Sequence, residues 1–209
     1  MSEIFLDLTH RISGATLPYP GDPPPEFGAV SQLPADECRV TRLTMATHTG
    51  THVDAPAHVV QTGKSLADYG LEDFFGQACV VDLRGHAGLI DESALDQVRA
   101  CDWLLLCTGL SARWGAPEYF TEGPEFTAAF VAKAARLTRK GVGLDCAGLD
   151  RDGVTLHREW FANGGELIVE NLNALETVLG RNVLQFAAVP MSIEAADGAP
   201  VRAYALAVD

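Results

Sequence analysis

Short runs of apolar residues recur along the chain between polar and turn-rich segments. Two of them, 78–83 and 103–108, are almost continuously apolar, which is typical of strands buried on both faces. Residues 38–46 alternate well enough to predict a strand. Further strands are expected at residues 4–9, 142–144, 167–169, 183–190 and 201–208.

Three other segments have the apolar spacing of helices: 66–74, 91–100 and 127–140. Asp91 is a suitable N-cap for the second helix, and Gly141 is expected to end the third. Strands and helices alternate in the middle of the chain, whereas strands dominate both ends. The pattern therefore predicts a mixed α/β fold with a central β core.

Two segments are expected to be irregular. Residues 109–124 are rich in turn residues and aromatic side chains, and they predict a loop. Residues 18–25 contain five prolines, which remove backbone donors and fix φ, so regular helix or central strand is excluded there. This second segment is either a rigid surface linker or a stiff lid that presents Tyr19 at the mouth of a pocket.

Length and charge narrow the function classes. A chain of 209 residues predicts a single domain over 1–209. The formal net charge of -13 and the absence of a Lys/Arg cluster argue against nucleic acid or an anionic membrane surface as a partner. We see no signal peptide and no apolar run long enough to span a bilayer. Five cysteines without a CxxC pair are expected to be reduced thiols, which predicts a cytoplasmic protein.

The candidate chemistry is concentrated between residues 48 and 58, which hold three of the six histidines and one aspartate. Imidazole and carboxylate are ligands that suit zinc, manganese or non-haem iron. A straight strand would separate His48 from Asp54 by about 20 Å, too far for one ion. We therefore expect a bend, with Gly50 supplying unusual backbone angles and Pro56 holding Ala55 extended.

Such a bend could bring His48, His52 and Asp54 onto one ion, with His58 nearby. A metal site with three protein ligands and one open position is typical of catalysis, whereas a site whose coordination shell is filled by four protein ligands is structural. The simpler alternative is a chance cluster on a solvated loop. The two histidines at positions 10 and 86 are expected to be ordinary surface or core residues.

Residues 48–58 resemble the signature of the metal-dependent cyclase family, which includes bacterial kynurenine formamidases and isatin hydrolases. Segments along most of the chain are also similar to the family: residues 7–10, 19–22, 108–109, 113–114, 143–150, 157, 170–172 and 188–190. The resemblance implies a swivelling β/β/α fold, assembly as a homodimer or larger homo-oligomer, and one or two divalent ions, zinc or manganese.

The resemblance also implies roles for particular residues. His48, His52 and Asp54 match ligands of a first ion, and Asp54, His157 and Glu170 match ligands of a second. His58 matches the catalytic acid/base. Without the resemblance, His157 and Glu170 would not stand out. Tyr19 lies where formamidases carry a substrate-stacking Trp.

The expected reaction is therefore hydrolysis of a small amide. N-formylkynurenine, cleaved to kynurenine and formate, is the first substrate hypothesis, and the lactam ring of isatin or another cyclic amide is the alternative. A hypothesis of another class is a non-catalytic, metal-stabilised binding domain in which His58 closes the ligand shell. A serine hydrolase is disfavoured because the G-x-S-x-G elbow is missing.

Other side chains are candidates for supporting roles. Candidates to orient the ligand imidazoles include Thr49, Thr51 and Asp145, together with Glu170. An aromatic wall for a planar substrate could come from Tyr19, Trp114 and Phe120. Ordinary packing of these rings is an equally good interpretation.

Overall fold

The computed structural model of the chain describes residues 2–86 and 88–208. Its main feature is one mixed sheet with the strand order β5-β12-β13-β4-β11-β10-β8-β6, to which β1 adds by pairing with β13. The strands of this sheet are β1 (Glu3–Asp7), β4 (His52–Asp54), β5 (Phe75–Gly76), β6 (Ala78–Asp82), β8 (Cys101–Cys107), β10 (Thr138–Leu144), β11 (Leu167–Glu170), β12 (Asn182–Pro190) and β13 (Gly198–Val208).

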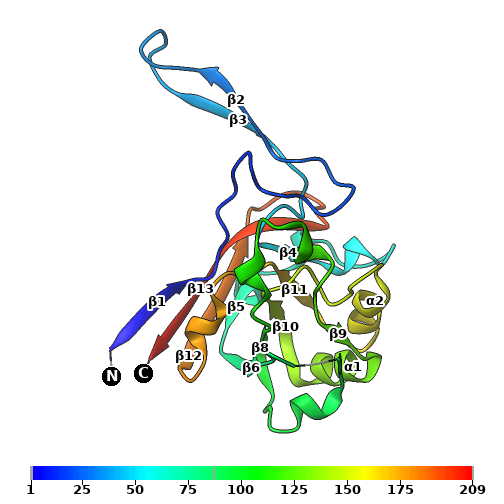
Figure 1. The fold of residues 1–209 in the computed structure, drawn as a ribbon. Helices are drawn as coiled ribbons and strands as arrows, with labels where there is room; N and C mark the ends of the chain where they lie inside the picture. Colours follow the sequence, from blue (N-terminus) through cyan, green and yellow to red (C-terminus); the bar gives the residue numbers. More distant parts are fainter. Residues whose placement is uncertain (1, 87, 209) are drawn as a thin grey trace.

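The sheet has a parallel half and an antiparallel half. Strands β6, β8, β10 and β11 are parallel to one another, whereas β4 is antiparallel to both β11 and β13. Strand β12 also lies close to β6 at the other end of the order, so the sheet curls towards a barrel (Figure 1). The short strand β4 lies where the two halves of the sheet meet.

Strand β8 explains why the central apolar runs are continuous. Trp103 and Leu105 face one core cluster, while Leu104 and Leu106 face a second cluster on the opposite side of the sheet. Helices α1 (Ala128–Leu137) and α2 (Thr155–Ala162) cover the second cluster. The predicted mixed α/β fold with a central β core is confirmed.

The third predicted helix is shorter than expected. Thr127 caps α1, but the helix ends at Leu137 and β10 begins at the next residue. Gly141 is therefore not a helix stop. It lies within β10, where an added Cβ would be 2.4 Å from the carbonyl oxygen of Leu167 and 2.6 Å from the Trp103 ring. Glycine is needed there because strand and ring approach the backbone closely.

The other two predicted helices are 3₁₀ turns. Residues 66–74 form two turns, Leu66–Asp68 and Leu71–Phe74, with Gly70 between them. In 91–100 only Glu92–Leu95 is helical, although Asp91 does cap it. In the first segment, extended backbone at Tyr69 and Gly70 separates the two turns, and glycine disfavours a helix interior. Helix α2 was not predicted.

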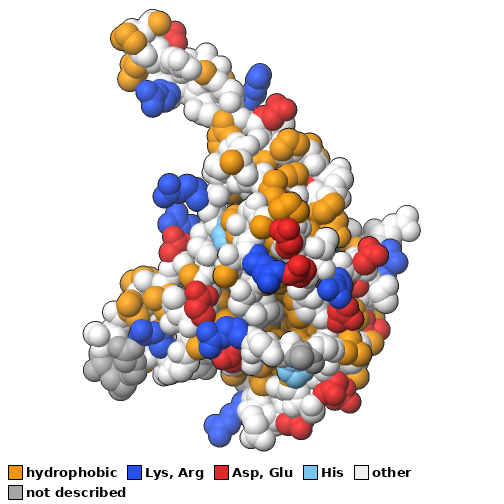
Figure 2. All heavy atoms as spheres, in the orientation of Figure 1, with side chains coloured by type: hydrophobic (Ala, Val, Ile, Leu, Met, Phe, Trp, Pro, Cys, Tyr) orange, Lys and Arg blue, Asp and Glu red, His pale blue; other side chains and the backbone are white. Residues whose placement is uncertain are grey.

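Residues 18–25 contain no helix or strand, as predicted. They lead to a hairpin of β2 (Glu26–Ser31) and β3 (Val40–Thr44), of which only the second strand was predicted. The hairpin projects from the body of the molecule (Figure 1), and hydrophobic side chains lie along it (Figure 2).

A second small sheet pairs β7 (Leu89–Ile90) with β9 (Glu125–Phe126). Within the described residues, no helix has the length and apolar character needed to cross a membrane.

Candidate metal centre

The histidine-rich segment bends before it enters the sheet. Gly50 has a φ of +71°, and an added Cβ would approach the Ile12 side chain to 2.9 Å, so both conformation and space favour glycine. The predicted bend is confirmed at Gly50, and a 3₁₀ turn over Pro56–His58 follows β4, with Ala55 extended as expected. Within β4, His52 and Asp54 project from one face while Val53 is buried in the core on the other.

Strand pairing brings more distant residues to this face. His52 lies opposite Glu170 on β11, and Asp54 lies opposite Gly198 on β13. His157 approaches from α2, with its Nε2 atom 3.0 Å from Glu170 Oε1. Residues more than 100 positions apart in the chain therefore share one end of the sheet.

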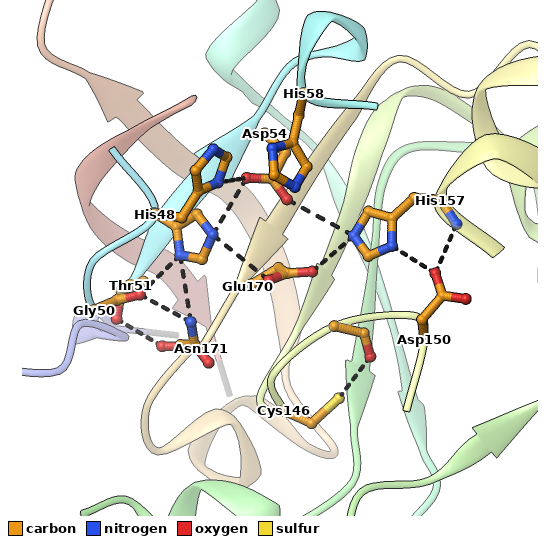
Figure 3. A network of polar contacts seen from close by, with 12 residues as sticks. His48, Gly50, Thr51, Asp54, His58, Cys146, Asp150, His157, Glu170 and Asn171 are labelled. Atoms are coloured by element: carbon orange, nitrogen blue, oxygen red, sulfur yellow. Dashed lines mark hydrogen bonds and ion pairs between the residues drawn. The ribbon is translucent and has the colours of Figure 1, made fainter. Parts of the chain in front are cut away.

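Asp54 is the centre of the cluster (Figure 3). Its Oδ1 atom lies 2.6 Å from His48 Nδ1 and 3.2 Å from His52 Nε2, while Oδ2 lies 3.8 Å from His157 Nε2. His52 Nε2 is also 3.5 Å from Glu170 Oε2. Three other predicted ligands, His48, His52 and His157, therefore lie against this carboxylate, and the fourth, Glu170, has an oxygen within 4.8 Å of it.

Two overlapping groups could each hold an ion. One comprises His48, Asp54 and His58, and the other comprises His52, Asp54 and Glu170; within each group the donor atoms lie within 4.8 Å of one another. Mixed imidazole and carboxylate donors fit zinc or manganese. The grouping differs from the sets implied by the family resemblance: His58 takes the place of His52 in the first group, and His52 takes the place of His157 in the second.

The carboxylates dominate the electrostatics. Burial lowers the pKa values of His48 and His157, but neighbouring carboxylates outweigh it and raise them to about 9 and about 10. Burial also opposes ionisation of Asp54, yet the adjacent imidazoles hold its pKa well below the usual value. Burial lowers the pKa of His58, whose side chain is 30% exposed. At neutral pH the cluster thus favours cations on His48 and His157 and a neutral imidazole at His58.

Sequence inspection missed the groups that orient the imidazoles. Asp150 Oδ2 lies 2.7 Å from His157 Nδ1, and Asp197 Oδ2 lies 2.9 Å from His48 Nε2. The carbonyl oxygen of Gly50 lies 2.9 Å from His52 Nδ1. The place of Asp150 seven residues before His157 was the one sequence signal that could have indicated it.

Thr51 and Asp145, which were expected to orient imidazoles, form hydrogen bonds to other groups instead. Thr51 donates to the Asn171 carbonyl oxygen and accepts from the His10 backbone N–H. Asp145 is fully buried and accepts from the backbone and hydroxyl of Thr108. Both residues therefore fix the loops around the site, whereas Glu170 contacts imidazoles directly.

A cavity of about 530 Å³ opens above the cluster. Tyr19, Trp114 and Phe120 all line it, as the aromatic-wall hypothesis requires. The Trp114 ring stacks on His10 with centroids 4.2 Å apart, and His10 is buried. Tyr19 remains 45% exposed at the cavity, so it can contact a ligand as well as Phe120.

A curled mixed sheet with clustered imidazoles and carboxylates beneath a cavity defines an α/β protein with a candidate divalent-metal centre. The chain belongs to the cyclase family: the family model described as "Putative cyclase" matches residues 6–151. It is 31% identical to an uncharacterized protein of Methanocaldococcus jannaschii over 97% of this chain and 98% of that protein. It is 30% identical to the kynurenine formamidase of Bacillus mycoides over 95% of each chain.

Solved structures support the fold. An isatin hydrolase bound to the product analogue thioisatinate matches with a TM-score of 0.83 at 19% identity, covering 98% of this chain and 92% of that one. A potential metal-dependent hydrolase with cyclase activity matches with a TM-score of 0.80 at 23% identity over 100% of both chains. The fold implied by the family resemblance is confirmed.

Proposed function

We propose that this protein is a metal-dependent hydrolase that cleaves a small, non-peptide amide, with N-formylkynurenine, hydrolysed to kynurenine and formate, as the first substrate to test. The observation that carries the proposal is the convergence of His48, His52, His157 and Glu170 on Asp54 beneath an aromatic-walled cavity. The 30% identity to a kynurenine formamidase supports the substrate.

The two oxygens of Asp54 support a division of the ligands between two ions. His48 and His52 lie on the Oδ1 side, and His157 lies on the Oδ2 side. Glu170 contacts both His52 and His157. We assign His48, His52 and Asp54 to one ion and Asp54, His157 and Glu170 to a second, with zinc or manganese as the metal. A divalent ion bound there would polarise the amide carbonyl and acidify water.

We assign His58 as the acid/base. Burial lowers its pKa, which keeps the imidazole neutral and able to accept a proton at pH 7. The centroid of its ring lies 4.0 Å from that of the His48 ring and 6.2 Å from that of the His157 ring, so His58 is near both sides of the cluster. From there it can take a proton from the attacking water and return it to the leaving nitrogen.

Two variants test this division of roles. His58→Ala should keep its metal but lose about 10²–10⁴-fold in kcat, the usual contribution of general acid–base catalysis. His52→Ala should lose metal as well as activity. His86→Ala, at an exposed histidine outside the cluster, is the matched control and should change neither. Equal metal content in the His58 and His52 variants would show that the roles are assigned wrongly.

The substrate needs a direct comparison. The fold likeness to an isatin hydrolase makes the isatin lactam the second candidate. Purified, metal-loaded protein should hydrolyse N-formylkynurenine with a higher kcat/KM than isatin. The reverse order would make the cyclic amide the substrate class, and no turnover of either would remove the proposed reaction.

A metal-stabilised binding domain is the competing class, because His58 lies close enough to complete a closed shell. Removing the metal with a chelator distinguishes the two. A hydrolase should lose turnover while its circular dichroism spectrum stays native, whereas a structural site should unfold on metal loss.

We also propose a homodimer or larger homo-oligomer, a single domain over residues 1–209 and a cytoplasmic location. The projecting β2–β3 hairpin supports assembly, since its apolar side chains at Phe27, Val30 and Leu43 are 48%, 64% and 46% exposed. All five cysteines are free, as the cytoplasm favours. Light scattering after size-exclusion chromatography should give at least twice the chain mass of 22.3 kDa.

A further inference from the structure

Asp197 has a carboxylate that faces two imidazoles of the site at once. It immediately precedes β13, and its backbone carbonyl oxygen accepts from the Ala55 N–H at 2.9 Å, which holds it beside the end of β4. Its Oδ1 atom accepts from the Thr47 hydroxyl at 3.1 Å. Its Oδ2 atom lies 2.9 Å from His48 Nε2 and 3.6 Å from His58 Nδ1.

The contact with His48 determines which nitrogen is available for a metal. An imidazole that is neutral, as a metal ligand must be, and that donates through Nε2–H to Asp197 keeps its lone pair on Nδ1, the atom that points at Asp54. The ring is also held sterically, since a Cβ added to Gly198 would lie 2.6 Å from His48 Cε1. Asp197 and Gly198 together leave His48 with one orientation.

The contact with His58 has a parallel consequence. At 3.6 Å the pair is longer than a hydrogen bond, as is common for catalytic contacts before substrate is bound. A carboxylate on this side favours the tautomer with the proton on Nδ1, which leaves the Nε2 lone pair free to accept a proton. The same oxygen therefore orients a metal ligand and sets the tautomer of the neighbouring ring.

We propose that Asp197 is a shared positioning residue, which orients His48 for metal binding and His58 for proton transfer. The proposal rests on the roles assigned to these two histidines above. It adds a third residue, 139 positions beyond His58 in the sequence, that touches no reacting atom itself.

Asp197→Asn tests the first half of the proposal through metal binding. Competition with a chromophoric chelator should show zinc affinity reduced by about 10–100-fold, the usual effect of losing such a partner. Glu194→Gln removes an exposed carboxylate from the same segment and should leave the affinity unchanged. Thr47→Val, which frees the Asp197 side chain without removing it, should lower the affinity by a smaller factor.

The second half is tested on His58 in the zinc-loaded protein. Imidazole ¹⁵N shifts should report the Nδ1–H tautomer of His58 in the natural sequence and a mixture of tautomers in Asp197→Asn. At saturating zinc, Asp197→Asn should lower kcat with little change in KM. In the His58→Ala background, the same substitution should lower kcat no further.

Unchanged zinc affinity in Asp197→Asn, or an unchanged His58 tautomer, would overturn the shared role. So would an additive loss of kcat in the double variant. These outcomes differ from failure of the proposed function, because a protein that turns over no amide still gives the zinc affinities and the ¹⁵N spectra.

Discussion

Metal binding to this protein should release protons, and the number released tests the electrostatics of the cluster. The nearby carboxylates raise the pKa of His48 to about 9 and that of His157 to about 10, so both imidazoles are protonated at pH 7 in the absence of metal. A metal ion needs the neutral imidazole. Binding must therefore displace about one proton from each of these two residues.

The magnitude follows from the two pKa values. At pH 7 about 1% of His48 and about 0.1% of His157 is neutral. Deprotonating them reduces the free energy of metal binding by about 3 and about 4 kcal/mol, at 1.36 kcal/mol per pKa unit. Apparent affinity should rise about tenfold per pH unit for each imidazole, up to the pKa of that imidazole. Acid should weaken binding by the same factor.

Calorimetric titration with zinc at pH 7, in buffers of different protonation enthalpy, measures the protons released as the slope of heat against buffer enthalpy. The slope should correspond to about two protons or more. His157→Gln should remove about one of them, and His86→Gln should remove none. Identical heats in all buffers would refute the argument, since they would mean that the ligands are already neutral at pH 7.

The remaining predictions concern stability and substrate binding. Burial lowers the pKa of His10 to about 4, so protonation of this residue favours the unfolded chain. The free energy of unfolding should therefore keep its full value above pH 6.5 and decrease as pH falls towards 4, by about 2 kcal/mol between pH 7.5 and 5. Urea unfolding should show this loss in the natural protein relative to His10→Gln, and parallel pH curves would contradict it. Gly141→Ala should destabilise the fold by about 1–3 kcal/mol through overpacking. Gly123→Ala should not, because the nearest atom would be 3.8 Å from the added Cβ. Equal melting temperatures for the two variants would disprove the close-approach argument. Tyr19→Ala should raise KM more than it lowers kcat, and Tyr19→Phe should keep the natural KM; an unchanged KM in the alanine variant would leave Tyr19 outside the substrate contact.

The elements predicted best from sequence were two apolar strands of the central sheet. β6 and β8 were predictable because side chains on both faces pack against a core cluster, although those of β6 are only half-buried. Helix boundaries were predicted less well. Thr127 marked the start of α1, but nothing local distinguished its end, because Thr138–Leu144 continues as strand only through pairing with β8 and β11.

Sequence was enough to indicate a candidate metal site, since three histidines and an aspartate within residues 48–58 are a local pattern and the bend at Gly50 is a local requirement. It could not show that Asp197 and Asp150 lie against the imidazoles of His48 and His157. Their positions depend on strand pairing and on the docking of α2, and a short polar side chain in a loop carries no periodic signal. Tertiary structure alone decided which distant carboxylates face which imidazole nitrogens, because those contacts join segments that only the folded sheet brings together.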